Sequence, residues 1–308
     1  MKRTITKAAA IVAALTLSAS LTACNRDSEG GDKVLLALST QTNPFFVQLR
    51  DGAQAKADEL GVELEIQDAS DDAATQVNQL NNAATTGADV VIVNPVDSDA
   101  VTPAVTQLNN ANIPVVAVDR GVNGAEVASF ISSDNVAGGR QAAEEVAKAV
   151  EDEGSVLVLQ GTPGSSSSRD RGAGFEEGLK SHPGVKVAAK QTANFDRAEA
   201  LNVTTNLLQA NPDVKAVFAE NDEMALGAIE ALGDRAGTEV PVVGFDGTED
   251  GIAAINDGTL TATIAQQPAE LGALAVEQAK KILDGQEAES EVPVEVLTVT
   301  KENVGEFE

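Results

Sequence analysis

The chain has 308 residues, of which 43% are hydrophobic and 22% are charged, so it can bury one large or two medium cores and is neither disordered nor fibrous. Its 48 acidic residues outnumber 21 basic ones, and the net charge of -27 repels nucleic acid and anionic lipid headgroups. One histidine, one cysteine and no tryptophan or tyrosine leave few side chains for catalysis or zinc binding. These counts argue against most hydrolases, metalloenzymes and nucleic-acid-binding proteins.

Residues 1–23 have the pattern of a secretory signal peptide. A basic start precedes a mostly apolar stretch, Ala8 to Leu21, which is too short for a comfortable membrane span. The stretch ends in Leu-Thr-Ala-Cys24, which resembles the lipobox of bacterial lipoproteins, whose cysteine thiol receives a diacylglyceryl group. We expect lipidation of Cys24, because a thiol at the end of a signal sequence has no core to enter. Residues 24–32 are polar and contain glycine, which predicts a flexible tether.

The first folded elements are a strand and a helix. Val34 to Ser39 reads as a buried strand, and Asn43 followed by Pro44 offers a helix N-cap and a proline in the first turn. Apolar residues then recur every three or four positions until Gly61, which suits a left-handed helix stop.

The same alternation of short apolar runs and longer helical stretches continues along the chain. Further strands are expected at Val62–Ile66, Val90–Val93, Val115–Val118, Val156–Leu159, Val185–Ala188, Ala216–Ala219, Val242–Phe245 and Thr261–Ala265. Strands that alternate with helices form parallel sheets with crossover connections, so the fold class is α/β.

Two halves of the chain repeat one another. The segment from Pro114 to Asp119 matches a second Pro-Val-Val-x-x-Asp segment that ends at Asp246. Asn94 precedes Asp119 by 25 residues, and Asn221 precedes Asp246 by 25 residues. Because ligands of parallel sheets bind beyond the carboxyl ends of the strands, these four residues are expected to converge on one cleft between two lobes.

The residues around these strand ends favour a neutral ligand with many hydroxyl groups. Two carboxylates, Asp119 and Asp246, balance the charges of Arg120 and Arg171, so selection depends on hydrogen-bond geometry. Aromatic rings cover the C–H faces of a sugar, and Phe45–Phe46 follows the first strand. From the sequence alone, these two rings fit the core of an amphipathic helix equally well.

Other motifs are better explained structurally. The run 161–168 (GTPGSSSS) lacks the ending of a phosphate-binding loop, and the glycines of 172–178 miss the dinucleotide-binding spacing. The acidic segment 246–257 is more consistent with a strand end and a capped helix than with a calcium loop. His182 stands before Pro-Gly in a turn. No metal site is predicted, and catalysis by the two aspartates is not expected because no metal or oxyanion-donor pattern accompanies them.

The sequence resembles the D-ribose-binding proteins of bacterial ATP-driven sugar importers, which belong to the type I periplasmic binding proteins. The similarity runs from about Val34 to Val299. Its segments include NPFF at 43–46, DGAQ at 51–54, NPVDSDAV at 94–101, SDN at 133–135, NDEMALGA at 221–228, GFDGT at 244–248 and ATIAQ at 262–266.

The resemblance implies two similar Rossmann-like lobes joined by three hinge crossovers, near Ser133, Gln266 and Pro293. The expected first lobe is residues 33–133 with 267–293, and the second is residues 134–266 with 294–308.

The resemblance also implies which residues contact the ligand. Those of the first lobe are Ser39, Asn43, Phe45, Phe46, Asn94, Asp119 and Arg120. Those of the second lobe are Arg171, Phe195, Asn221, Asp246 and Gln266. Arg171 is chosen over its neighbour Arg169.

The implied function is a monomeric, exported capture protein, not an enzyme and without a cofactor. The lipobox differs from the freely soluble export signal of the best-known members, so we expect this protein to be lipid-anchored. It would bind a monosaccharide, with D-ribose as the first candidate, and deliver it to a permease driven by a cytoplasmic ATPase. The alternatives are allose, galactose or another pentose. A sugar-sensing regulator needs a basic DNA-binding headpiece, which residues 1–32 do not resemble, and an exported glycosidase is the remaining alternative.

Overall fold

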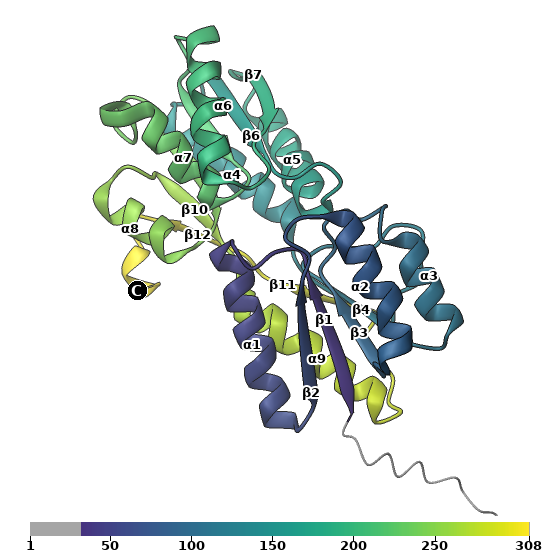
Figure 1. The fold of residues 1–308 in the computed structure, drawn as a ribbon. Helices are drawn as coiled ribbons and strands as arrows, with labels where there is room; N and C mark the ends of the chain where they lie inside the picture. The colour runs from purple at the N-terminus through teal and green to yellow at the C-terminus, as the bar shows by residue number, and fades with distance from the viewer. Residues whose placement is uncertain (1–31, 308) are drawn as a thin grey trace, which may run out of the picture. The chain divides into compact units, whose positions relative to one another are not determined.

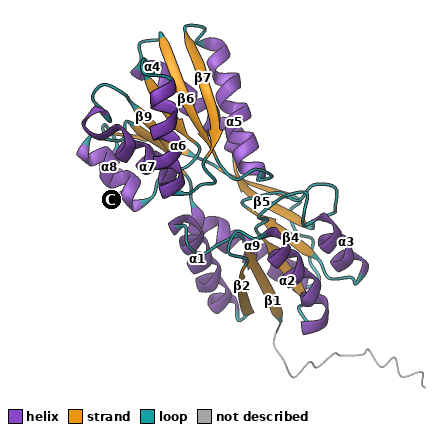
Figure 2. Cartoon of the chain, turned by 45° about the horizontal axis from the view of Figure 1, so that its top comes forward, coloured by secondary structure: helices purple, strands orange, loops and turns teal. Residues whose placement is uncertain are grey.

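A computed structural model describes residues 32–307, which form two α/β lobes, each built on a six-stranded sheet (Figures 1 and 2). The predicted signal peptide, Cys24 and all of the tether except Asp32 lie outside the described residues. Within 32–307, no helix combines the length and the apolar character needed to cross a membrane.

The first lobe contains a fully parallel sheet with the strand order β11-β5-β4-β3-β1-β2. Its strands are β1 (Lys33–Leu38), β2 (Glu63–Asp68), β3 (Val90–Val93), β4 (Val115–Val118), β5 (Ser129–Ser133) and β11 (Glu291–Val294). Its helices are α1 (Pro44–Leu60), α2 (Ala73–Thr86), α3 (Thr102–Asn110) and α9 (Pro268–Leu283).

Both faces of this sheet are covered, which explains why its central strands are apolar throughout. Successive side chains of β1 point to opposite faces. Leu36 packs with Leu49 of α1 and Leu271 of α9, whereas Leu35 packs with Leu80 of α2 and Leu108 of α3.

The second lobe repeats this architecture with the strand order β12-β10-β9-β8-β6-β7. Its strands are β6 (Gly154–Gln160), β7 (Val185–Thr192), β8 (Ala216–Ala219), β9 (Val242–Asp246), β10 (Ala262–Ala265) and β12 (Leu297–Thr300). Its α-helices are α4 (Asn135–Ala149), α5 (Ser166–Gly178), α6 (Arg197–Ala210), α7 (Asp222–Leu232) and α8 (Glu249–Asp257). Short 3₁₀ turns are η1 (Leu179–Ser181), η2 (Gly233–Arg235) and η3 (Val304–Glu306).

The two faces of the second sheet are also covered by different helices. Val156 and Val158 pack in the core cluster that includes α4 and α5, while Leu157 and Leu159 pack with α6, α7 and α8. Only β12 departs from the parallel arrangement, because it pairs with β10 in the antiparallel sense.

The chain passes between the two sheets three times within the described residues. It leaves the first sheet after β5, returns between β10 and α9, and leaves again between β11 and β12. Each lobe is therefore made of two separate stretches of chain.

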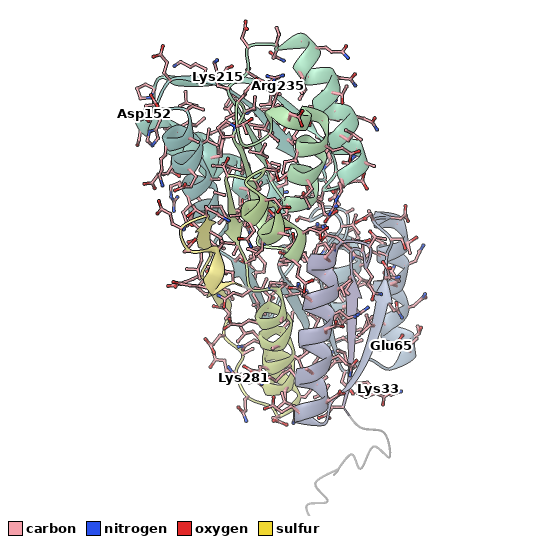
Figure 3. The ribbon with its side chains drawn as sticks, turned by 90° about the vertical axis from the view of Figure 1, so that its left-hand side faces the viewer. Lys33, Glu65, Asp152, Lys215, Arg235 and Lys281 are labelled. Atoms are coloured by element: carbon pink, nitrogen blue, oxygen red, sulfur yellow. The ribbon has the colours of Figure 1, made fainter. Side chains whose placement is uncertain are left out.

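The carboxyl ends of the parallel strands of both sheets face the region between the lobes (Figure 1). Lys33 begins β1 and Lys215 precedes β8, and both lie toward the outer ends of their lobes, as do Lys281, Asp152 and Arg235 (Figure 3). The opposite ends of these strands are thus directed inward, where unpaired loop and helix termini can meet a ligand.

Candidate functional site

A buried network at the ends of β1, β3 and β4 orients Asp119. The Asn94 amide oxygen accepts hydrogen bonds from the Ser39 hydroxyl, at 2.7 Å, and from the Ser39 backbone N–H, at 3.2 Å. The Asn94 amide nitrogen donates to the Asp119 Oδ2 atom at 3.1 Å and to the Val118 carbonyl at 3.2 Å. This network fixes one carboxylate oxygen of Asp119 and leaves the buried Oδ1 atom without a partner.

Arg120 lies between two aromatic rings that come from different lobes. Its guanidinium carbon is 5.1 Å from the Phe46 ring centroid and 5.4 Å from that of Phe195, within the range of cation–π attraction. One terminal nitrogen donates to the Pro95 carbonyl at 3.1 Å. The Nε atom lies 3.7 Å from the Asp119 Oδ2 atom but has no hydrogen-bond partner.

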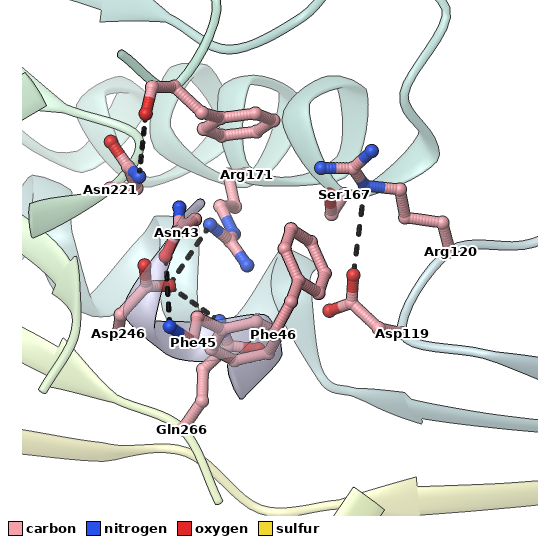
Figure 4. A pocket seen from close by; sticks show the side chains of 11 residues that line it. Asn43, Phe45, Phe46, Asp119, Arg120, Ser167, Arg171, Asn221, Asp246 and Gln266 are labelled. Atoms are coloured by element: carbon pink, nitrogen blue, oxygen red, sulfur yellow. Dashed lines mark hydrogen bonds and ion pairs between the residues drawn. The ribbon is translucent and has the colours of Figure 1, made fainter. Parts of the chain in front are cut away.

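The start of α1 presents the two phenylalanine rings. The Asn43 side chain caps the helix by accepting from the Phe45 N–H at 2.9 Å, and Pro44 occupies the first helical position. The Phe45 and Phe46 rings meet edge to face, with centroids 5.1 Å apart. Both rings belong to the core cluster of the first lobe and also line the pocket (Figure 4). Each ring therefore packs in the core and forms part of the pocket wall at the same time.

Arg171 and Asp246 form the corresponding charged pair of the second lobe. Their Nη1 and Oδ1 atoms are 3.5 Å apart, and Asp246 Oδ1 also accepts from the Gln266 side-chain nitrogen at 2.7 Å (Figure 4). Arg171 is anchored by donating to the Asn135 side chain at 2.8 Å and to the Glu220 carbonyl at 2.6 Å. The Gln266 Oε1 atom is buried and has no hydrogen-bond partner.

Asn221 links the start of α7 to the Phe195 loop. Its side-chain oxygen caps α7 by accepting from the Met224 N–H at 2.9 Å, and its nitrogen donates to the Phe195 carbonyl at 3.4 Å. Phe195 has a φ of 61°, and a Cβ atom at Gly161 would lie 2.0 Å from its ring. A larger residue at position 161 would therefore have to displace the Phe195 ring from its place in the pocket.

These side chains meet in one pocket, with about 230 Å³ of free space that includes its solvent-open part. It is lined by Asn43, Phe45, Phe46, Asp119, Arg120, Ser167, Arg171, Phe195, Asn221, Asp246 and Gln266.

Ten of the twelve residues predicted to contact the ligand thus line this pocket. The other two, Ser39 and Asn94, are fully buried beneath it and reach it only through Asp119. Arg171 lines the pocket, whereas Arg169 donates to the Gly164 carbonyl at 3.1 Å.

Ser167 is the pocket residue that the sequence reasoning missed. It lies in the first turn of α5, four positions before Arg171 and thus on the same helical face. That spacing was the available signal, but the run GTPGSSSS has no apolar periodicity that would predict that α5 begins within it, at Ser166.

Burial dominates the electrostatics of the pocket. Loss of water raises the pKa of Asp119, and the positive charges of Arg120 and Arg171 offset part of that rise. The pKa of Asp246 is raised for the same reason, with Arg171 opposing the rise. Burial also lowers the pKa of Arg120. Two acids and two guanidinium groups thus balance in a site that favours an uncharged partner.

His182 and Asp250, from two other motifs of the sequence, form contacts with neighbouring side chains. His182 Nδ1 lies 2.6 Å from Asp152 Oδ1, and Asp250 forms an ion pair of 2.7 Å with Arg197. Among residues 32–307, no group of three or more acidic, histidine or cysteine side chains could hold a metal ion.

The chain belongs to the family described as periplasmic binding protein domain, whose model matches residues 34–287. It is 46% identical to the ribose import binding protein RbsB of Escherichia coli K12 over 96% of this chain and 99% of that protein. The RbsB protein of Bacillus subtilis 168 is 40% identical, over 93% of this chain and 96% of that relative.

Solved structures agree with this assignment. The myo-inositol-binding protein of Caulobacter, bound to myo-inositol, is 35% identical with a TM-score of 0.86, over 90% of this chain and 96% of that one. A solute-binding protein of Actinobacillus succinogenes with bound D-allose is 33% identical with a TM-score of 0.82, over 89% and 99%. The protein therefore has the type I periplasmic binding protein fold, and it is an extracytoplasmic solute-binding protein rather than an enzyme.

Proposed function

We propose that this protein captures a neutral monosaccharide between its two lobes for import by an ATP-driven transporter. D-ribose is the first candidate for that monosaccharide. The main support is a set of three buried atoms without a hydrogen-bond partner, all on residues that line one pocket. They are Asp119 Oδ1, Arg120 Nε and Gln266 Oε1. Buried polar atoms are normally paired, so two acceptors and one donor are available for the ligand. Hydroxyl groups satisfy both kinds, because each donates one hydrogen bond and accepts others.

The charges and rings of the pocket support a sugar over an ion. The balanced acids and guanidinium groups give neither an anion nor a cation a net advantage. Phe45, Phe46 and Phe195 add apolar ring surface suited to the C–H faces of a sugar.

The particular sugar is supported by the relatives. The two ribose import binding proteins are 40% and 46% identical to this chain, which favours D-ribose. The neighbour with bound D-allose is 33% identical, so allose, galactose and other pentoses are the competing ligands. One or two altered contacts are enough to change such a choice.

Delivery follows from closure of the lobes. We propose that residues 33–133 with 267–293 form one moving body and residues 134–266 with 294–308 the other, joined at the three crossovers. The ligand favours the closed state only through contacts it gains there. The closed monomer would then dock on a membrane permease whose energy comes from a cytoplasmic ATPase.

The membrane anchor is a separate proposal. Cys24, once lipidated, would hold the protein on the outer face of the cell membrane, with residues 24–32 as its tether. Mass spectrometry of the protein purified from the membrane fraction should find a chain that begins at Cys24 and carries acyl groups. An unmodified mature protein recovered entirely from the soluble fraction would contradict the anchor.

Calorimetry with a panel of pentoses and hexoses tests the ligand. We expect D-ribose to bind with micromolar or better affinity, about -8 kcal/mol, and to raise the melting temperature. The assignment to ribose is wrong if ribose gives no heat at millimolar concentration while another sugar does. A glycoside of the sugar that binds should also be recovered unchanged after prolonged incubation, and its hydrolysis to the free sugar would favour a glycosidase.

A further inference from the structure

The loop between β6 and α5, residues 161–165, and the first turn of α5 meet the first lobe directly, outside the pocket. The Gly121 N–H donates to the Ser166 hydroxyl oxygen at 2.8 Å, and the Ser98 N–H donates to the Gly164 carbonyl at 3.1 Å. Ser98 and Gly121 belong to the first lobe, and Gly164 and Ser166 to the second. We call these four residues the closing contact.

Each side of the closing contact is also held by hydrogen bonds within its own lobe. In the second lobe, Arg169 donates to the same Gly164 carbonyl at 3.1 Å, and the Ser165 side chain caps α5. In the first lobe, the Asn123 N–H donates to the Ser98 carbonyl at 2.9 Å. Little ordering is therefore needed when the surfaces join, which favours a productive contact.

The fit depends on the missing side chain of Gly164. This residue has a φ of +89°, and a Cβ atom added to it would lie 2.2 Å from the Asp97 Oδ2 atom of the first lobe. A larger residue would have to displace the Asp97 side chain, whose Oδ1 atom accepts from the Asp99 and Ala100 N–H groups at 2.8 Å, or move the loop away from the first lobe. Gly164 thus stands where the loop of the second lobe packs against Asp97, and Ser167 is the only residue of the run 161–168 that lines the pocket.

The closing contact is adjacent to the pocket but does not line it. Gly121 follows Arg120 and Ser166 precedes Ser167, and both Arg120 and Ser167 line the pocket. A ligand that holds these two neighbours therefore also brings the closing contact together. The contact adds stability to the closed state that does not come from the ligand itself.

We propose that Gly164 and Ser166 are affinity-determining residues, which set how tightly the protein retains its ligand by stabilising closure without touching the ligand. Affinity for a sugar, the first readout of this role, rests on the proposed function. When the open state is favoured, the apparent affinity falls in proportion to the lost closed population. Removing one hydrogen bond between the lobes should weaken affinity by about three- to tenfold.

Two variants of the full chain test this by calorimetry with the sugar that binds the wild type. Ser166→Ala removes the acceptor of the Gly121 N–H, and we expect about three- to tenfold weaker binding with faster dissociation. Gly164→Ala adds the obstructing Cβ atom, and we expect a loss of tenfold or more. Wild-type affinity in both variants overturns the proposal.

Matched controls separate this effect from general damage. Ser181→Ala makes the same change in η1, at the other end of α5. Gly87→Ala places alanine at a φ of +84° but has nothing within 4 Å of the new Cβ atom. Both controls should bind like the wild type, although Gly87→Ala should melt lower. Equal affinity losses in Gly87→Ala and Gly164→Ala would also overturn the proposal.

A ligand-free readout keeps the proposal independent of the sugar. Hydrogen exchange of the Gly121 amide should be slower in the unliganded wild type than in Ser166→Ala, while amides of the β-strands exchange alike. Identical Gly121 exchange rates contradict the closing contact. A panel in which no sugar binds, together with a clear difference in Gly121 exchange, rejects the proposed function and supports the contact.

Discussion

Individual residues of the pocket are positioned by different means in the two halves, although the halves repeat in sequence. Asn94 donates to Asp119, whereas Asn221 caps α7 and it is Gln266 that donates to Asp246. The equal spacing of 25 residues predicted that the asparagines and aspartates share a site, but it could not say which pairs bond. Such pairing depends on side-chain direction, which the strand period alone does not determine.

The two pocket aspartates should dominate ligand affinity. Asp119→Ala or Asp246→Ala removes acceptors and leaves buried guanidinium groups without their counter-charge, so each should cost about 2 kcal/mol or more, roughly a 30-fold loss of affinity. Calorimetry measures the loss, with Asp213→Ala, at an exposed turn, as the control. Near-native affinity in both pocket variants would remove these residues from the site.

Glu220 gives the protein a pH-dependent stability. Its carboxylate accepts from the Gly161 N–H at 2.8 Å and from the Ser168 hydroxyl, and burial raises its pKa from 4.5 to about 7 despite Arg171 and Lys190. The folded state therefore holds a proton that the unfolded state loses at lower pH. This stabilisation is complete below about pH 4.5 and is lost as pH rises through 7.

The difference is measurable by urea unfolding at a series of pH values. From pH 5 to 8 the wild type should lose roughly 2 to 3 kcal/mol of unfolding free energy relative to Glu220→Gln, whose amide does not titrate. Glu302→Gln, an exposed change, should follow the wild type. Parallel curves for the wild type and Glu220→Gln would mean that the Glu220 pKa is not raised.

Among the elements, the predictable strands are those with an apolar run of their own. All nine strands expected from the sequence are present, although β7 extends to Thr192 instead of ending at Ala188. The missed strands are β5, β11 and β12. β5 (SFISS) has only two apolar residues, β12 (LTVT) alternates apolar and polar residues, and β11 (EVPV) contains a proline, so none has the buried run used to find the others. Neighbouring strands from distant parts of the chain select these segments.

Helices α1 and α9 show how an element from late in the chain becomes part of the first lobe. A Cβ atom at Gly272 would lie 2.0 Å from the Leu49 carbonyl oxygen, and one at Gly52 would lie 2.1 Å from that of Ala269. The helix backbones therefore approach each other closely at two glycines. This contact joins α9 to the first sheet after the chain has already built most of the second.

Gly272→Ala separates packing from helix propensity. In an unobstructed helix interior, alanine should stabilise by about 1 kcal/mol relative to glycine. Here the new methyl group forces α1 and α9 apart, and we expect a loss of about 2 kcal/mol in the free energy of unfolding. Urea unfolding measures it, with Gly305→Ala as the control because nothing lies within 4 Å of its Cβ position. A more stable Gly272→Ala variant would contradict the close approach.

For the whole molecule, the acidic excess opposes compactness. Acidic residues outnumber basic ones by 48 to 21, so like-charge repulsion outweighs the surface ion pairs, which contribute little individually. The Debye length, beyond which interactions between exposed charges are largely screened, is about 8 Å at physiological ionic strength and about 3 Å at 1 M. Raising the salt concentration should therefore relieve more repulsion than it removes attraction.

We expect the melting temperature to rise by about 2 to 4 °C when sodium chloride is raised from 0.02 to 0.5 M, which corresponds to a gain on the order of 1 kcal/mol. Calorimetry without sugar measures the shift, so that ligand binding does not contribute. A variant in which several exposed glutamates, such as Glu144, Glu153 and Glu302, are changed to glutamine should melt higher at low salt and respond less to added salt. A melting temperature that falls with salt would show that ion pairs outweigh the repulsion.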